Sequence, residues 1–204
     1  MQPKEFKRQL DELGRVISDG IAYFVAWRVL MVEDEDSAHA LNRYRGLFLS
    51  ARSALLGMAL MQFAKVFDKD PRAVSLRNLL GLAKENRENL TPHATDGNLL
   101  DIDRKIEDSE SLLHRLKCYR DQRLAHHDST VTGDTRLLYG EVTKLIEETK
   151  SMYNSLTRAH ERASMAFEFL GRETERHTSE VVRIMREDRE RAARRIKETD
   201  ISTT

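Results

Sequence analysis

The chain has 204 residues, of which 40% are hydrophobic and 33% are charged, with nine glycines and a formal net charge of zero. This composition is sufficient for a hydrophobic core and favours long amphipathic helices over a sheet. A neutral chain has no overall field that would attract nucleic acid, so any binding of anions must come from local clusters of charge.

Cys118 is the single cysteine, which excludes an internal disulfide and fits a reducing compartment. The residues from Met1 to Phe6 have no apolar signal core, so we expect a cytoplasmic protein. The most apolar stretch, residues 47–67, is interrupted by Arg52, Gln62 and Lys65. We therefore expect a buried helix there and no membrane span.

Apolar residues recur every three or four positions from the start of the chain, which predicts a first helix over residues 3–32. Asp36 or Ser37 is suited to cap a second helix over residues 38–67. The latter half of that helix is apolar on most faces, so it is expected to be central in the fold. A short helix is expected over residues 75–86, followed by a polar loop over residues 87–98.

A third long helix is predicted from residue 99 because one stripe carries Leu99, Ile102, Ile106, Ser109, Leu113, Leu116, Arg120 and Leu124. Arg120 therefore occupies a core-facing register. Residues 127–134 are typical of a loop. A fourth long helix, capped by Asp134, is expected from Thr135 to Leu170, with a break permitted at Gly171.

Short connections between these helices predict an all-α, up-and-down antiparallel bundle over residues 1–171. Residues 172–204 are expected to form a charged helical extension with a thin apolar line. That extension either packs on a partner or is a solvated tail.

The most informative segment runs from Tyr119 to Asp128 and contains Arg120, Asp121 and the pair His126 and His127. A guanidinium on a packing face must have an anionic partner or line a cleft, because burying it unpaired costs several kcal/mol. Histidine is the side chain that titrates nearest neutral pH. Two other arginine–histidine pairs have a similar spacing, at residues 87 and 93 and at residues 172 and 177, but both lie in polar surroundings.

The run Arg120-Asp121-x-x-Leu124-Ala125-His126 resembles the signature of HEPN domains, which is an arginine, usually followed by a polar residue, and then a histidine after four to six positions. Before it come an Ala/Leu-rich helix ending in Phe67-Asp68 and the run Ser75-Leu76-x-x-Leu79-Leu80. This order of motifs resembles the abortive-infection U-type branch of that superfamily. The resemblance covers about residues 41–170.

The resemblance implies a helical, metal-independent endoribonuclease that acts in a toxin–antitoxin or phage-defence system. In such enzymes a ribose 2′-hydroxyl attacks the adjacent phosphate and leaves a 2′,3′-cyclic phosphate. Arg120 and His126 would carry the catalysis, with Asp121 orienting one of them. Arg123, His127 and Lys117 are expected to bind the RNA. No metal and no cofactor are expected, and the implied partners are RNA, a second copy of the chain and a cognate antitoxin or defence partner.

Two alternatives stay open from the sequence. In a continuous helix His127, not His126, shares the face of Arg120, so the choice of histidine depends on where the helix ends. Arg120 could also form an ion pair with an acid from another helix, with the histidines placed at a helix C-terminus. In that case the chain would be a non-catalytic helical interaction module, or a subunit that binds RNA or a nucleotide without cleaving it.

Overall fold

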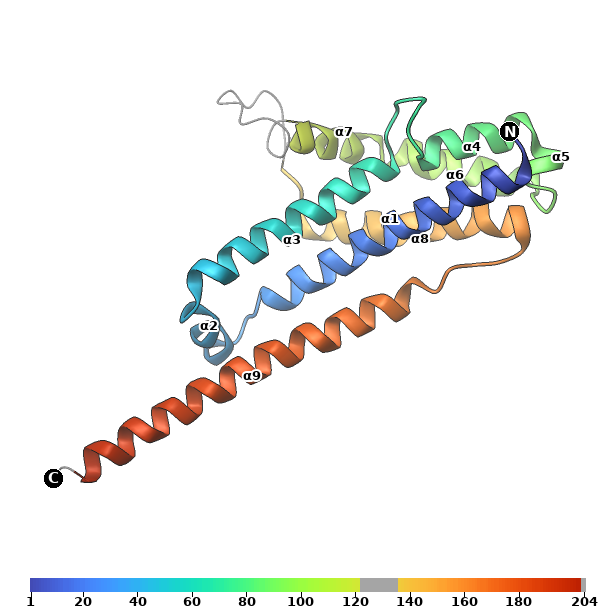
Figure 1. Ribbon diagram of the computed structural model, residues 1–204. Coiled ribbons are helices and arrows are strands. Elements are labelled where there is room, and N and C mark those ends of the chain that lie inside the picture. Colours follow the sequence, from blue (N-terminus) through green and yellow to red (C-terminus); the bar gives the residue numbers. More distant parts are fainter. Residues whose placement is uncertain (122–135, 203–204) are drawn as a thin grey trace. The chain divides into compact units, whose positions relative to one another are not determined.

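The computed structural model describes residues 1–121 and 136–202, and every regular element in these residues is a helix (Figure 1). The elements are α1 (Pro3–Leu30), α2 (Glu35–Asn42), α3 (Arg45–Val66), α4 (Leu76–Glu85), α5 (Arg87–Leu90), α6 (Asp96–Asp108), α7 (Glu110–Tyr119), α8 (Tyr139–Glu161) and α9 (Phe167–Ser202). The prediction of an all-α fold is confirmed.

The helices group into two compact units. The first consists of Met1–Ile21 and Gly57–Phe167, and the second consists of Ala22–Leu56 and Glu168–Thr204. Helices α1 and α3 are each divided between the two units, at residues 21/22 and 56/57. The predicted division of the chain at residue 171 stays a prediction.

Contacts between side chains define the antiparallel packing of the first unit. Lys7 of α1 binds Glu161 at 2.8 Å, and the Tyr153 hydroxyl donates to the Leu10 carbonyl at 3.1 Å. Along these contacts the residue numbers of α8 fall as those of α1 rise, so the two helices run in opposite directions. Helix α7 also runs opposite to α8, since Ser109 at its start binds Glu148 at 3.2 Å while Arg115 further along binds Glu141 at 2.6 Å.

The core of the first unit consists of the apolar faces of these helices, and its fully buried side chains include Phe6, Leu10, Leu13, Ile17, Phe63, Leu76, Leu79, Leu90, Ile102, Leu116 and Met152. Most of these positions follow the three- and four-residue spacing that predicted the helices. Burial of each such side chain contributes about 1.5–3 kcal/mol to folding, which fixes which face of each helix turns inward.

The second unit has a small apolar cluster of Leu30, Leu41 and Val182, from α1, α2 and α9. Ion pairs flank this cluster, including Arg28 with Glu175 at 3.0 Å and Arg189 with Asp36 at 3.1 Å. The apolar line expected in the charged extension included Val181, which is wrong because Val181 is exposed and its neighbour Val182 is buried instead. Of the two alternatives at the next position of that line, Ile184 is exposed and Met185 packs against the cluster.

The predicted second helix is divided in two. Helix α2 ends at Asn42 and α3 begins at Arg45, with a turn between them. Its cap is Asp34 and not Asp36 or Ser37, because the Asp34 carboxylate accepts the Ser37 backbone N–H at 2.8 Å.

The predicted third helix is also divided, at Ser109, between α6 and α7. Ser109 is buried, and its hydroxyl lies 3.2 Å from the Glu148 carboxylate of α8. The predicted stripe is buried from Leu99 to Leu116 despite this break. The stretch expected to be a polar loop contains α5.

The fourth helix begins later and ends earlier than expected. Helix α8 starts at Tyr139, and the predicted cap lies outside the described residues. It ends at Glu161 because Arg162 adopts a left-handed conformation, with φ of 57°. Gly171 is not a break but a buried position within α9.

Helix α3 is long and apolar enough to cross a membrane, when judged by length and composition only. A core helix of a soluble protein meets the same criterion, and the residues of α3 from Ala59 to Val66 are buried at most positions. The helix is therefore weak evidence for a membrane span.

Candidate functional site

Arg120 lies at the C-terminal end of α7. Its backbone N–H donates to the carbonyls of Leu116 and Lys117, and Arg120 and Asp121 continue the chain as a wider, π-helical turn. Such turns change the direction in which side chains leave a helix and are frequent at functional sites. The Arg120 side chain is 22% exposed, so it lies at the edge of the core and not within it.

Two carboxylates hold the Arg120 guanidinium. Its Nε donates to Asp121 Oδ1 at 2.7 Å, and its Nη1 donates to Asp68 Oδ2 at 3.0 Å. Asp121, and then Asp68, raise the pKa of Arg120 above its ordinary value, although partial burial opposes them. The arginine is therefore charged at any physiological pH.

These contacts leave one edge of the guanidinium only partly used. Asp68 occupies Nη1, and Nη2 makes no hydrogen bond to any residue in the described ranges 1–121 and 136–202. A phosphate binds best through two parallel N–H donors. A phosphate could therefore take the Nη1–Nη2 edge if it displaced Asp68.

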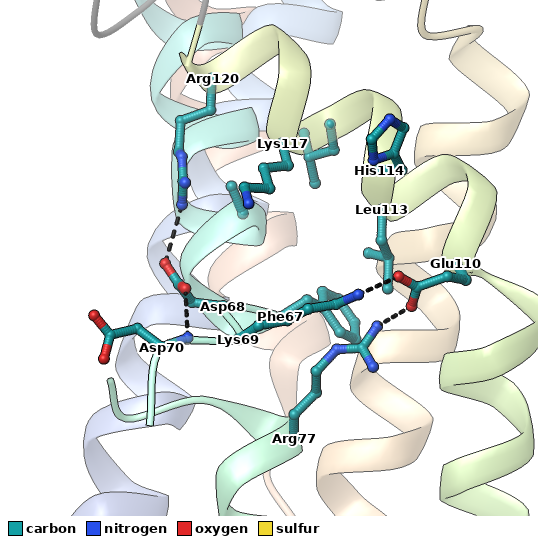
Figure 2. Close-up of a pocket in the computed structure, with 12 residues that line it drawn as sticks. Phe67, Asp68, Lys69, Asp70, Arg77, Glu110, Leu113, His114, Lys117 and Arg120 are labelled. Carbon is teal, nitrogen blue, oxygen red and sulfur yellow. Dashed lines mark hydrogen bonds and ion pairs between the residues drawn. The ribbon is translucent and has the colours of Figure 1, made fainter. Parts of the chain in front are cut away.

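Arg120 lines a cavity of about 290 Å³ in the first unit (Figure 2). The apolar part of its lining comes from the C-terminal end of α3 and from α7, and consists of Ala64, Phe67, Leu113 and Leu116. The polar part consists of Asp68, Lys69, Asp70, Arg77, Glu110, His114, Lys117 and Arg120. An apolar surface with a few converging polar groups is typical of small-molecule sites.

A second charged cluster lies in the same cavity, away from Arg120. Lys69 and Arg77 both bind the Glu110 carboxylate, as Figure 2 shows. The hydrogen bond from Lys69, together with the nearby Arg77, lowers the pKa of Glu110, and partial burial opposes this shift. One carboxylate shared by two cations leaves this end of the cavity with a net positive charge.

His114 lies on α7 between the two clusters, Lys117 lies on the same helix near Arg120, and both are exposed (Figure 2). Lys117 forms no ion pair with another residue that the structure describes, whereas His114 Nε2 lies 3.6 Å from Cys118 Sγ. The Lys117 ammonium is therefore available to an anionic ligand.

The structure brings Arg120, Asp121 and Lys117 together at one end of α7. Arg123, His126 and His127 lie outside the described residues, so their positions, and the choice between the two histidines, stay predictions.

Sequence reasoning did not assign Asp68, Lys69, Arg77, Glu110 or His114 to the site. Two signals could have identified some of them. Asp68 stands in the motif order as the residue that ends the Ala/Leu-rich helix. Glu110 and His114 precede Lys117 at helical spacing and share its face.

Metal binding finds no support in the part of the chain that the structure describes, where no group of three or more His, Cys, Asp or Glu side chains could hold an ion. The expectation of metal-independent chemistry stays a prediction. The polar groups of the cavity are cations and ion-paired carboxylates, an arrangement suited to an anionic ligand.

Comparison with known proteins gives one match. The family model HEPN_AbiU2, described as AbiU2, matches residues 3–181. No curated protein and no solved structure matches the chain. Because the match extends over most of the chain and agrees with the motif order and the all-helical fold, the chain belongs to the HEPN superfamily, in its abortive-infection U-type branch, AbiU2.

Proposed function

We propose that the protein is a metal-independent endoribonuclease that acts as a toxin or phage-defence effector in the cytoplasm. Membership of the HEPN superfamily points to a ribonuclease or defence-related function. The observation that carries the proposal is the placement of Arg120, which is oriented by Asp121 at the edge of a cavity and belongs to the motif that leads to His126.

The chemistry needs a base for the ribose 2′-hydroxyl and a cation for the phosphate. His126 takes the proton of the 2′-hydroxyl, and the oxygen forms a bond to phosphorus while the bond from phosphorus to the 5′-oxygen breaks. A proton delivered to the 5′-oxygen balances the one removed. The products are a 2′,3′-cyclic phosphate and a 5′-hydroxyl.

Arg120 would stabilise the negative charge that develops on the non-bridging oxygens. Its bond to Asp121 supports this role, because a guanidinium already held at Nε loses less freedom when it binds phosphate. Lys117, Arg123 and His127 would bind the RNA backbone through charge.

The test is cleavage of structured RNA and of total transfer RNA by the purified protein in the presence of a chelator. We expect products with cyclic phosphate ends, and a loss of about a hundredfold or more in rate for Arg120→Ala and His126→Ala. The matched controls are Arg172→Ala and His177→Ala, which alter the arginine–histidine pair in α9. Cleavage by both site variants at the rate of the parent would refute the proposed site.

We further propose that the protein forms a homodimer and is held inactive by a cognate antitoxin or defence partner. A second copy would bring two Arg120–His126 motifs to one substrate. Light scattering measures the mass, and a mixture of Arg120→Ala and His126→Ala proteins should recover part of the activity if the motifs cooperate across the dimer. A monomeric active enzyme would refute the dimer.

A second candidate function is a non-catalytic interaction module. It is favoured by α9, on which Phe169, Val181 and Ile184 are exposed although they are large and apolar. Such residues often mark protein–protein contacts. In this case Arg120→Ala would lower stability through the lost Asp68 pair, and no RNA would be cleaved.

A further inference from the structure

The cavity next to Arg120 has a charged cluster at each end and an apolar surface between them (Figure 2). At one end are Arg120 and Lys117, and at the other are Lys69 and Arg77. Phe67 and Leu113 belong to the apolar surface and are themselves 5% and 7% exposed, so this wall of the cavity is part of the core.

Both ends have cationic groups for an anion, and at the Arg120 end the anion would take the place of Asp68. Lys69 and Arg77 share the single carboxylate of Glu110, which leaves an excess of one positive charge there. At the other end, Lys117 forms no ion pair within residues 1–121 and 136–202, and the Nη1–Nη2 edge of Arg120 is only partly used.

We propose that this cavity binds one nucleoside of an RNA chain together with the phosphates on its two sides. The base lies against the apolar surface, one phosphate is bound by Lys117 and Arg120, and the other is bound by Lys69 and Arg77. The proposal deepens the proposed function and rests on it for the identity of the polymer. It makes the cavity the subsite that positions the phosphate at Arg120 for cleavage.

The size and chemistry of the cavity favour a nucleotide over other anions. A volume of about 290 Å³ is near the lower limit of small-molecule sites and suits one base, not an oligomer. A base has apolar faces that bury well against aromatic and aliphatic side chains. An acidic peptide or a simple inorganic anion would leave the apolar surface without a partner.

His114 lies at the middle of α7 between the two clusters and is exposed beside the cavity. In this position its imidazole can contact the ribose or the base edge by hydrogen bonding. It is a positioning residue and not a catalytic residue, since the reacting phosphate would be at Arg120.

The test is calorimetric titration of the full-length His126→Ala protein with nucleoside 3′,5′-bisphosphates of the four bases. The matching 5′-monophosphates, nucleosides and inorganic pyrophosphate are titrated in parallel. We expect affinity to fall in the order bisphosphate, monophosphate, nucleoside, and pyrophosphate to bind less well than the bisphosphate because it cannot use the apolar surface.

Two variants then test whether each end of the cavity binds a phosphate. Lys69→Ala and Lys117→Ala should each weaken binding of the bisphosphate by about tenfold, since each removes a charge-assisted hydrogen bond. The Lys69 and Lys117 side chains are exposed, so both variants should fold. Lys144→Ala is the matched control, because Lys144 is an exposed lysine of α8 that is paired with a glutamate and lies outside the cavity.

Equal binding of pyrophosphate and bisphosphate, or equal affinity in Lys69→Ala and Lys144→Ala, would overturn the nucleotide subsite. Stronger binding of a poly-glutamate peptide than of the bisphosphate would also overturn it. These outcomes can be distinguished from failure of the proposed function. If Lys69→Ala cleaves RNA at the rate of the parent, only the subsite is refuted and the ribonuclease function is not. If the protein binds the bisphosphate but cleaves no RNA, the subsite is supported and only the proposed ribonuclease activity is refuted.

Discussion

The ion pair between Asp68 and Arg120 predicts that Asp68 competes with the substrate. Asp68 accepts from Nη1 of Arg120 at 3.0 Å, which is one of the two nitrogens that a bidentate phosphate would use. Asp121 accepts from Nε and leaves that edge free. Replacing Asp68 by asparagine keeps the size of the side chain and removes its charge, so RNA should bind more tightly to the variant.

The free energy of the Asp68–Arg120 ion pair can be judged from how far its two side chains are exposed. The two side chains are 22% and 30% exposed, which places the interaction at the upper end of the range for ion pairs near the surface, about 1 kcal/mol. If the substrate no longer has to displace this charge, the Kd for RNA should fall by about fivefold. The free energy of unfolding should fall by a similar amount, about 1 kcal/mol.

Fluorescence anisotropy with a labelled RNA measures the Kd, in the His126→Ala background so that the RNA stays intact. Urea unfolding measures the loss of stability. Asp121→Asn is the matched control, because it removes the other carboxylate and should lower kcat by releasing Nε, without tightening the binding of RNA. If Asp68→Asn weakens RNA binding, or lowers kcat as much as Asp121→Asn, Asp68 orients Arg120 and does not compete with the phosphate.

Three further predictions concern stability. The pKa of Glu110 is lowered from its ordinary value of 4.5 in the folded protein, so the stabilisation is present at neutral pH and is lost as the pH falls through the folded pKa. Below pH 4.5 the thermal unfolding of Glu110→Gln should therefore depend less on pH than that of the parent, and equal dependence would contradict this. Gly14→Ala should lower the free energy of unfolding by about 1–3 kcal/mol, because its Cβ would lie 2.5 Å from the Tyr153 hydroxyl. Gly81→Ala is its control: no atom lies within 4 Å of the added Cβ, and alanine should stabilise α4 by about 0.5–1 kcal/mol; denaturant unfolding that gives both variants the same sign would contradict the assigned packing. Leu41→Ala should destabilise the second unit by about 2–5 kcal/mol, seen as faster hydrogen exchange in α2, and unchanged exchange would show that its apolar cluster contributes little.

The sequence by itself determined the helical class and the inward face of each helix. The spacing of residues such as Phe6, Leu10, Ile102 and Leu116 identified buried positions correctly, because burial of apolar side chains is what selects the face of a helix. The order of the motifs, from Phe67 to Leu80 and then from Arg120 to His126, also pointed to the family, and the family model that matches residues 3–181 confirms it.

Helix ends were less predictable from the sequence. The break at Ser109 leaves the hydrophobic stripe unbroken, so periodicity gives no sign of it. The end of α8 depends on the left-handed conformation of Arg162 and on the Asn154 side chain, which bonds both backbone groups of Met165. Such contacts form only when the chain has already turned back, so the local sequence does not indicate them.

The tertiary structure decided the surroundings of Arg120. The sequence placed Arg120 on the seam and required an anionic partner or a cleft beside it, but it did not indicate which acid would be the partner. The partner Asp68 is 52 residues away along the chain and reaches the guanidinium only because α3 ends beside the end of α7. The cations opposite, Lys69 and Arg77, meet Glu110 for the same reason. Any buried charge needs a partner, so this requirement can be read from a single residue in the sequence. Which residue becomes the partner depends on how distant helices pack together.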